Sequence, residues 1–172
     1  LYPYAMEGKA LRLQLSAPGL VISGNPSPTI GNSRDSLSLQ ESNRFIEKYP
    51  KSKYLKNIMI RMGQVYYING SYNESINILS RALNLKKLKD EDKNTIYLYL
   101  AKSYSGIKDY NSANKIANLI NKTTVQGRDT YEDALWAIGK SYIDNGDYLR
   151  AQNKLNQALS LQGKRYAEIV WK

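Results

Sequence analysis

Residues of the same kind recur along the chain at a fixed interval of 38 positions, and this repeat restricts the possible folds more than any other feature. The repeated columns are the tyrosine pairs Tyr66 and Tyr72, Tyr104 and Tyr110, and Tyr142 and Tyr148; the small residues Gly63, Ala101 and Gly139; the apolar residues Met62, Leu100 and Ile138; and the small residues Ser75, Ala113 and Ala151. A fixed period of about 20–50 residues is typical of stacked structural units. The chain is therefore expected to contain several copies of one unit.

Each unit is predicted to consist of two helices joined by a short turn. In the third copy, the first helix has an apolar face made of Ala134, Leu135, Ile138 and Tyr142. Gly146 is expected to end that helix, and Asp147 to cap the next one by accepting backbone N–H bonds. The second helices carry the apolar sets Ile76, Leu79, Ala82 and Leu83; Ala113, Ile116, Ala117 and Ile120; and Ala151, Leu155, Ala158 and Leu159.

The small residues of the repeat predict where the two helices of a unit approach each other most closely. Gly63, Ala101 and Gly139 lie on the first helix, and we expect the second helix to cross there. The small residues at Ser75 and its equivalents would lie on the other side of the crossing, and the tyrosines would fill the space around it.

This pattern resembles the tetratricopeptide repeat (TPR) family. The matching residues are Met62, Gly63, Tyr66, Gly70, Tyr72, Ser75, Leu79 and Ala82 in the first full unit, and Ile138, Gly139, Tyr142, Gly146, Tyr148, Ala151, Leu155 and Ala158 in the third. The middle unit departs from it, with Lys108 at the turn glycine and Ile120 at the late alanine. The resemblance covers about residues 54–162. It implies an all-α fold, a right-handed solenoid of helical hairpins with about three to four TPR units.

The domain organisation follows from the same comparison. An N-terminal arm or linker is expected over residues 1–33, either extended or a hairpin with short strands around Leu11–Leu15 and Leu20–Ser23. The solenoid spans residues 34–172, with units at about 34–53 (partial), 54–91, 92–129 and 130–163 and a final helix at 164–172. In the partial unit, Phe45 and Ile46 are expected to face inward and Pro50 to end the helix.

The segment FIEKYPKSKY, at residues 45–54, is similar to the junctions between units in bacterial cell-envelope TPR proteins, namely outer-membrane-assembly lipoproteins and the periplasmic partner of the Tol-Pal system. This resemblance implies an envelope or periplasmic location, and the cytoplasm is the alternative. Because the chain begins with Leu1, we expect it to be a piece of a longer protein. An N-terminal anchor in the part of the longer protein that is missing from this sequence would associate it peripherally with a membrane.

The composition argues against an enzyme. The chain has no cysteine and no histidine, which excludes thiol nucleophiles, the usual zinc ligands and the commonest general base. No cofactor and no metal is expected. The formal net charge of +10 favours an acidic partner, or it reflects an AT-rich coding sequence. The densest lysine cluster, Lys86, Lys87 and Lys89, is followed at once by three acidic residues, Asp90, Glu91 and Asp92.

The resemblance implies that a protein or peptide binds in the concave groove lined by the first helices. The positions that would face this groove are Ile60, Gln64 and Tyr67; Leu98, Lys102 and Ser105; and Trp136, Lys140 and Ile143. An apolar groove with two lysines would favour an acidic side chain or a C-terminal carboxylate in the ligand. In the competing interpretation, a neighbouring helix or the N-terminal arm buries Ile60, Leu98 and Trp136. The predicted function is a protein-interaction scaffold, and the alternative is a basic solenoid that binds nucleic acid.

Overall fold

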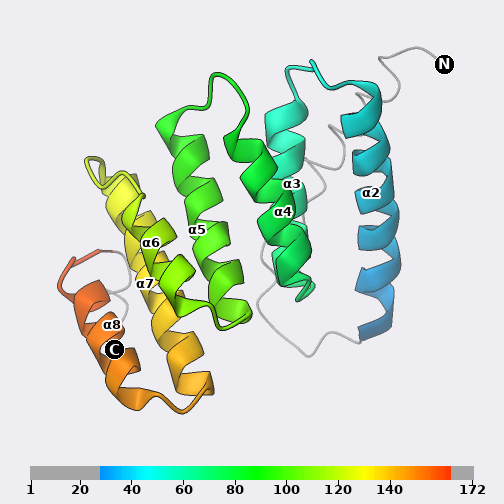
Figure 1. Cartoon of the computed structure of the whole chain (residues 1–172). Helices are drawn as coiled ribbons and strands as arrows, with labels where there is room; N and C mark the ends of the chain where they lie inside the picture. The colour runs from blue at the N-terminus through cyan, green and yellow to red at the C-terminus, as the bar shows by residue number, and fades with distance from the viewer. Residues whose placement is uncertain (1–27, 164–172) are drawn as a thin grey trace.

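The computed structural model describes residues 28–163, with side chains from residue 38 onward. All regular secondary structure in that part is α-helical. The helices are α2 (Pro28–Lys48), α3 (Leu55–Ile68), α4 (Tyr72–Leu83), α5 (Asp90–Gly106), α6 (Tyr110–Asn118), α7 (Val125–Asp144) and α8 (Tyr148–Leu159), as Figure 1 shows. The prediction of an all-helical solenoid is confirmed.

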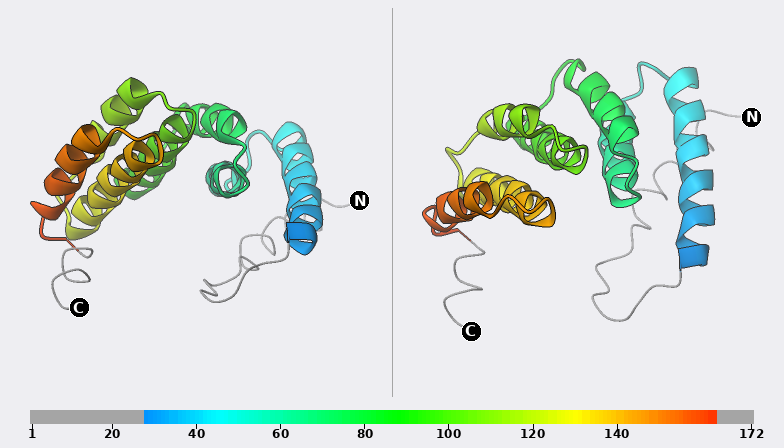
Figure 2. Two further views of the ribbon diagram at one scale, coloured as in Figure 1. Left: turned by 90° about the horizontal axis from the view of Figure 1, so that it is seen from below. Right: turned by 60° about the horizontal axis from the view of Figure 1, so that its bottom comes forward.

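Consecutive helices pack as antiparallel pairs, and the pairs stack along an arc (Figures 1 and 2). The pairs are α3 with α4, α5 with α6, and α7 with α8. The first helices of the pairs also contact one another, because α3 packs against α5 and α5 packs against α7. These three helices therefore form a continuous inner layer, on which side chains from different units meet.

The predicted close crossing within a pair is present in the first and third full units. A Cβ atom added at Gly63 would overlap the side chain of Leu79 in α4, and one added at Gly139 would lie 2.8 Å from Cδ2 of Leu155 in α8. Ser75 donates a hydrogen bond from Oγ to the carbonyl oxygen of Gly63 at 2.8 Å. Glycine is needed on the first helix because the second helix leaves no room for a side chain.

A buried polar contact joins the first two units. Ser103 of α5 donates from its hydroxyl to the hydroxyl of Ser75 in α4 at 2.9 Å, and both side chains are fully buried. Leu79, Ile96 and Leu100 of the same two units belong to one core cluster and are at most 1% exposed. This buried hydrogen bond favours one register of the two units, because sliding would separate the Ser103 hydroxyl from the Ser75 oxygen that accepts from it.

The turns within the pairs have a shared geometry. Gly70 and Gly146 adopt left-handed conformations with φ of 76° and 77°, and Lys108 takes the same region at φ 64°. Asp109 and Asp147 then cap α6 and α8, each accepting a bond from the backbone N–H three residues on, at 3.0 and 3.2 Å. The predicted roles of Gly146 and Asp147 are confirmed. The hydrogen bonds from Ser112 lower the pKa of Asp109.

Several predicted boundaries differ from the structure. The helix α2 begins at Pro28, although the arm was expected to continue to residue 33; proline fits the first turn of a helix, where its missing N–H is not needed. The boundary placed after residue 129 falls inside α7. That helix begins at Val125, because the side chain of Thr124 caps it by accepting from the Gly127 N–H at 3.0 Å.

Two further expectations concern single segments. Ile120 was expected on the second helix of the middle unit, but α6 ends at Asn118 and Ile120 is buried just beyond it. Phe45 and Ile46 are buried, as predicted, at 1% and 8% exposure. The strands proposed near Leu11–Leu15 and Leu20–Ser23, and the final helix at 164–172, lie outside the described residues. In the described part, none of the helices combines the length and apolar character that crossing a bilayer requires.

Candidate partner-binding groove

A cavity of about 530 Å³ lies where the three inner helices approach each other, and we call it the groove. Its wall comes from α3, α5 and α7, with contributions from the start of α4 and from the turns after α5 and α7. The lining residues are Tyr67, Tyr72, Lys102, Ser105, Gly106, Lys108, Asp133, Trp136, Ala137, Lys140, Ser141, Asp144 and Asn145. Side chains from three successive units thus share one surface.

Aromatic rings form one end of the groove. The ring of Tyr67 lies 5.8 Å from that of Tyr72 and 5.6 Å from that of Tyr99, the second pair being edge to face. The ammonium group of Lys102 lies over two of these rings, 5.9 Å from the centroid of Tyr67 and 5.0 Å from that of Tyr99. Cation–π attraction holds the lysine at the wall, where its charge faces the same space as the rings.

The charges of the lining favour an anion. Lys102, Lys108 and Lys140 carry three positive charges, and Asp133 and Asp144 carry two negative ones. Lys108 and Lys140 are exposed and come from different units. An extended segment with an acidic group would find positive charge next to an aromatic surface.

Burial affects the phenols of two tyrosines in the aromatic cluster, Tyr67 and Tyr99. Burial raises the pKa of Tyr67, and the nearby Tyr72 and Tyr99 add to this effect. Burial also raises the pKa of Tyr99, with the charge of Asp133 adding to it and that of Arg61 opposing it. Both phenols therefore stay protonated at neutral pH and can donate a hydrogen bond to a carboxylate or a peptide carbonyl.

A smaller cavity of about 220 Å³ lies between α3 and α5, lined by Asn57, Ile60, Arg61, Gln64, Asp92 and Thr95. Asp92 accepts from the Nζ of Lys56 at 2.5 Å and from the Lys89 N–H at 3.1 Å. Burial would raise the pKa of Asp92, but these hydrogen bonds and the two lysine charges outweigh it, so the pKa is lowered. The ion pair ties the first two units together beside this cavity.

The structure divides the positions that the sequence predicted for the groove. Tyr67, Lys102, Ser105, Trp136 and Lys140 line the groove itself. The smaller cavity is lined by Ile60 and Gln64, with Ile60 only 9% exposed. Leu98 and Ile143 line neither of these cavities: Leu98 is half-buried against the apolar core formed by α5 to α8, and Ile143 is 43% exposed. The role of these residues in binding a partner stays a prediction.

Other groove residues were not predicted from the sequence. Tyr72 was assigned to packing within its unit, but its ring also lines the groove beside Tyr67. Lys108 was noted only as a departure from the turn glycine, and that departure was the signal that could have found it. Ser141 lines the groove and also donates from Oγ to the carbonyl of Ser105 at 2.9 Å, which joins the second and third units.

The described part of the chain offers no arrangement suited to a metal ion. Between residues 38 and 163, no group of three or more acidic side chains gathers closely enough to hold one. The acidic residues at the helix ends act as caps, as at Asp109 and Asp147. The groove instead presents aromatic rings, hydroxyls and charged groups of both signs.

A comparison with protein-family models places most of the chain in a family. Residues 37–170 match the family model described as the SusR N-terminal TPR domain. No curated protein matches the chain. The matched segment contains all the helical pairs and both cavities described above. Because this match covers most of the 172-residue chain, the protein belongs to the family of SusR N-terminal TPR domains.

Proposed function

We propose that this domain is a protein-interaction scaffold that binds an extended protein segment with an acidic group in the groove. The observation that carries the proposal is the meeting of aromatic and lysine side chains from three successive units in one cavity of about 530 Å³. TPR domains generally bind protein partners, which is consistent with the family to which the chain belongs.

The binding energy would come from two parts of the groove. Trp136 and the ring cluster around Tyr67 offer aromatic surface, and residues of this kind commonly dominate the energy of an interface. Lys108 and Lys140 would select an acidic side chain or a C-terminal carboxylate, mainly by raising the rate of association. An apolar residue of the ligand would lie on the rings and its acidic group between the lysines.

A peptide library with free or amidated C-termini provides the test. We expect the intact chain to enrich sequences that pair an aromatic or apolar residue with an acidic group. The double variant Lys108→Gln and Lys140→Gln should bind the enriched peptides about tenfold or more weakly, as fluorescence anisotropy would measure. The control double variant Lys115→Gln and Lys154→Gln removes the same charge from α6 and α8, outside the groove.

Two results would contradict this assignment. Enrichment with no acidic group would remove the lysines from the mechanism, and an equal loss in both double variants would mean that only net charge matters. The second part of the proposal is a role in a bacterial cell-envelope assembly, supported by the similarity of residues 45–54 to unit junctions in envelope proteins. Fractionation of the source cells tests it, and recovery in the cytosolic fraction alone would refute it.

A further inference from the structure

The turns that lead from one helical pair to the next are strongly basic. They span residues 49–54, 84–89 and 119–124, between α2 and α3, α4 and α5, and α6 and α7. These turns contain no aspartate or glutamate, and every lysine in them is exposed. The lysines, which we call the basic edge, are Lys51, Lys53, Lys86, Lys87, Lys89 and Lys122.

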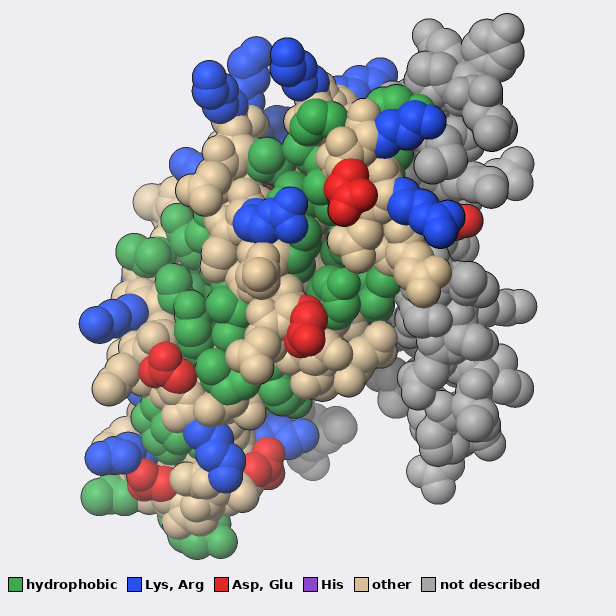
Figure 3. All heavy atoms as spheres, turned by 45° about the vertical axis from the view of Figure 1, so that its right-hand side comes forward, with side chains coloured by type: hydrophobic (Ala, Val, Ile, Leu, Met, Phe, Trp, Pro, Cys, Tyr) green, Lys and Arg blue, Asp and Glu red, His purple; other side chains and the backbone are tan. Residues whose placement is uncertain are grey.

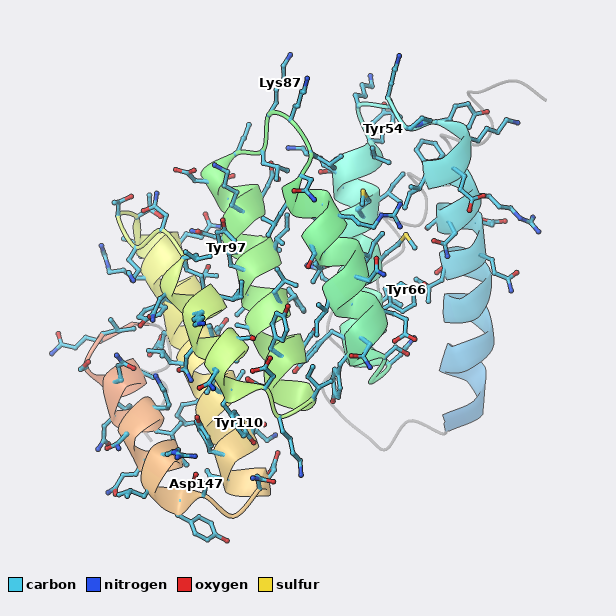
Figure 4. The ribbon with its side chains drawn as sticks, viewed as in Figure 1. Tyr54, Tyr66, Lys87, Tyr97, Tyr110 and Asp147 are labelled. Atoms are coloured by element: carbon cyan, nitrogen blue, oxygen red, sulfur yellow. The ribbon has the colours of Figure 1, made fainter. Side chains whose placement is uncertain are left out.

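The basic edge lies on one side of the solenoid, because successive helices are antiparallel. All three turns lie on the upper side of the arc in Figure 1, and Lys87 projects from that side in Figure 4. Figure 3 shows lysine and arginine side chains gathered along the same upper border. The turns within the pairs lie on the opposite side, where Asp147 is found, and contain one lysine and two aspartates.

Three acidic residues, Asp90, Glu91 and Asp92, follow the second turn and offset part of its lysine charge, since the charge of Lys89 helps to lower the pKa of Asp92. Asp92 accepts from Lys56 and from the backbone N–H of Lys89, and it completes the N-terminal cap of α5. Asp90 pairs with Lys93 at 3.8 Å and accepts from the Asn121 side chain at 3.1 Å. Asp90 and Asp92 thus also have partners outside the turns, and the six exposed lysines of the basic edge outnumber the three acidic residues that follow the second turn.

We propose that the basic edge docks on an anionic lipid surface. A flat membrane can meet all three turns at once, whereas the groove offers its charges to a single narrow segment. Each lysine close to an anionic surface strengthens binding about fivefold. Two large apolar residues at the third turn, Leu119 and Val125, are 56% and 65% exposed and would enter the headgroup region beside Lys122.

The side chains of the edge fit lipid better than nucleic acid. Its charged residues are lysines, which act as point charges, and not arginines, whose planar fork recognises phosphate in two-point contacts. Stacking with bases requires free aromatic rings. The two tyrosines of the first turn, Tyr49 and Tyr54, are half-buried and pack against the core cluster, so they are not available for it.

Vesicle sedimentation tests the proposal with the full chain. The probes are vesicles of phosphatidylcholine, with or without phosphatidylglycerol, at low and high salt. We expect binding only with the anionic lipid, and a steep loss at high salt because exposed charges are screened. The triple variant Lys51→Gln, Lys86→Gln and Lys87→Gln should bind on the order of 100-fold more weakly.

A matched control separates the edge from net charge. The triple variant Lys108→Gln, Lys115→Gln and Lys140→Gln removes the same charge from outside the edge, so its vesicle binding should stay close to that of the intact chain. This control also removes two groove lysines, so it should lose the peptide binding proposed above while the edge variant keeps it. Failure of one proposal therefore does not mimic failure of the other.

A fluorescent probe tests the orientation. Because the chain has no cysteine, single labels can be placed through Asn84→Cys at the basic edge and Asn69→Cys at the opposite edge, each an exposed residue just after a helix. Only the Asn84 label should show a blue-shifted emission with anionic vesicles. Binding without anionic lipid, equal losses in the two triple variants, or binding to an RNA oligonucleotide but not to vesicles would overturn the proposal.

Discussion

Replacing Lys108 with glycine should make the protein more stable, although it removes a residue from the candidate groove. Lys108 has a φ of 64°, and the equivalent turns of the other two units place Gly70 and Gly146 at 76° and 77°. A side chain in the left-handed region costs about 1–2 kcal/mol, because Cβ crowds the following carbonyl. Glycine avoids this cost but loses about 0.5–1 kcal/mol more backbone entropy on folding.

The steric cost that glycine avoids exceeds the entropic cost that it adds, so Lys108→Gly should raise the free energy of unfolding by about 0.5–1 kcal/mol. In a domain of this size, the midpoint of thermal unfolding should then rise by about 1–4 °C. The side chain of Lys108 is exposed, so little packing is lost with it. Urea unfolding followed by far-UV circular dichroism measures the change directly.

Two control variants distinguish backbone strain from charge. Lys108→Ala removes the charge but keeps a Cβ at the left-handed position, so its stability should remain close to that of the parent. Gly146→Ala introduces a Cβ at the corresponding turn, where φ is 77°, and should lower stability by about 1 kcal/mol. If Lys108→Ala stabilises as much as Lys108→Gly, charge repulsion is the cause and the argument from strain is wrong.

Three further substitutions test the packing of the solenoid. Gly63→Ala should destabilise by about 1–3 kcal/mol in urea unfolding, because the new Cβ overlaps the fully buried Leu79; an increase in stability would refute the close crossing. Asn94→Ala should lower the free energy of unfolding by about 2–3 kcal/mol and speed hydrogen exchange at Asn121. The Asn94 side chain accepts from the backbone N–H of Asn121 at 2.8 Å and donates to the backbone carbonyl of Asn121 at 3.1 Å. Asp92→Asn should make stability less sensitive to acid. The pKa of Asp92 is lowered in the folded protein, so the ionised carboxylate stabilises the fold at pH values above the pKa of the unfolded chain, about 4. This stabilisation is lost as the pH falls through the pKa of Asp92 in the folded protein. Unfolding midpoints measured across that pH range check this, and parallel curves for parent and variant would contradict it.

The helical pairs could be predicted because the residues that determine the packing within a unit lie close together in its sequence. Gly63 and Gly139 mark the crossings, and Gly146 followed by Asp147 marks the end of one helix and the start of the next. These signals depend on backbone geometry and helix capping, and both are determined by residues that are close together in the sequence. The start of α7 was predicted too late because Thr124 caps a first turn that lies before the apolar pattern begins.

The groove was less predictable because its shape depends on how the units stack. Ile60 and Trp136 occupy comparable positions in their units, yet Ile60 lines the smaller cavity and Trp136 the groove. The difference arises from the contacts between α3, α5 and α7, which no single unit encodes. The ring of Tyr99 supports the groove residue Tyr67 from the next unit, and that contact joins residues 32 positions apart.

The strained position of Lys108 connects stability with the proposed function. A glycine there would suit the turn better, as Gly70 and Gly146 show in the neighbouring units, but it would leave the groove with one positive charge fewer. Backbone strain at a residue of the proposed binding groove is consistent with a role of Lys108 in binding rather than in folding. Lys108→Gly should therefore be more stable than the parent and bind the acidic peptides more weakly, whereas Lys87→Gly, at a left-handed position of the basic edge, should gain stability without weakening peptide binding. Equal peptide affinity in the two variants would show that the strained residue Lys108 does not contribute to peptide binding in the groove.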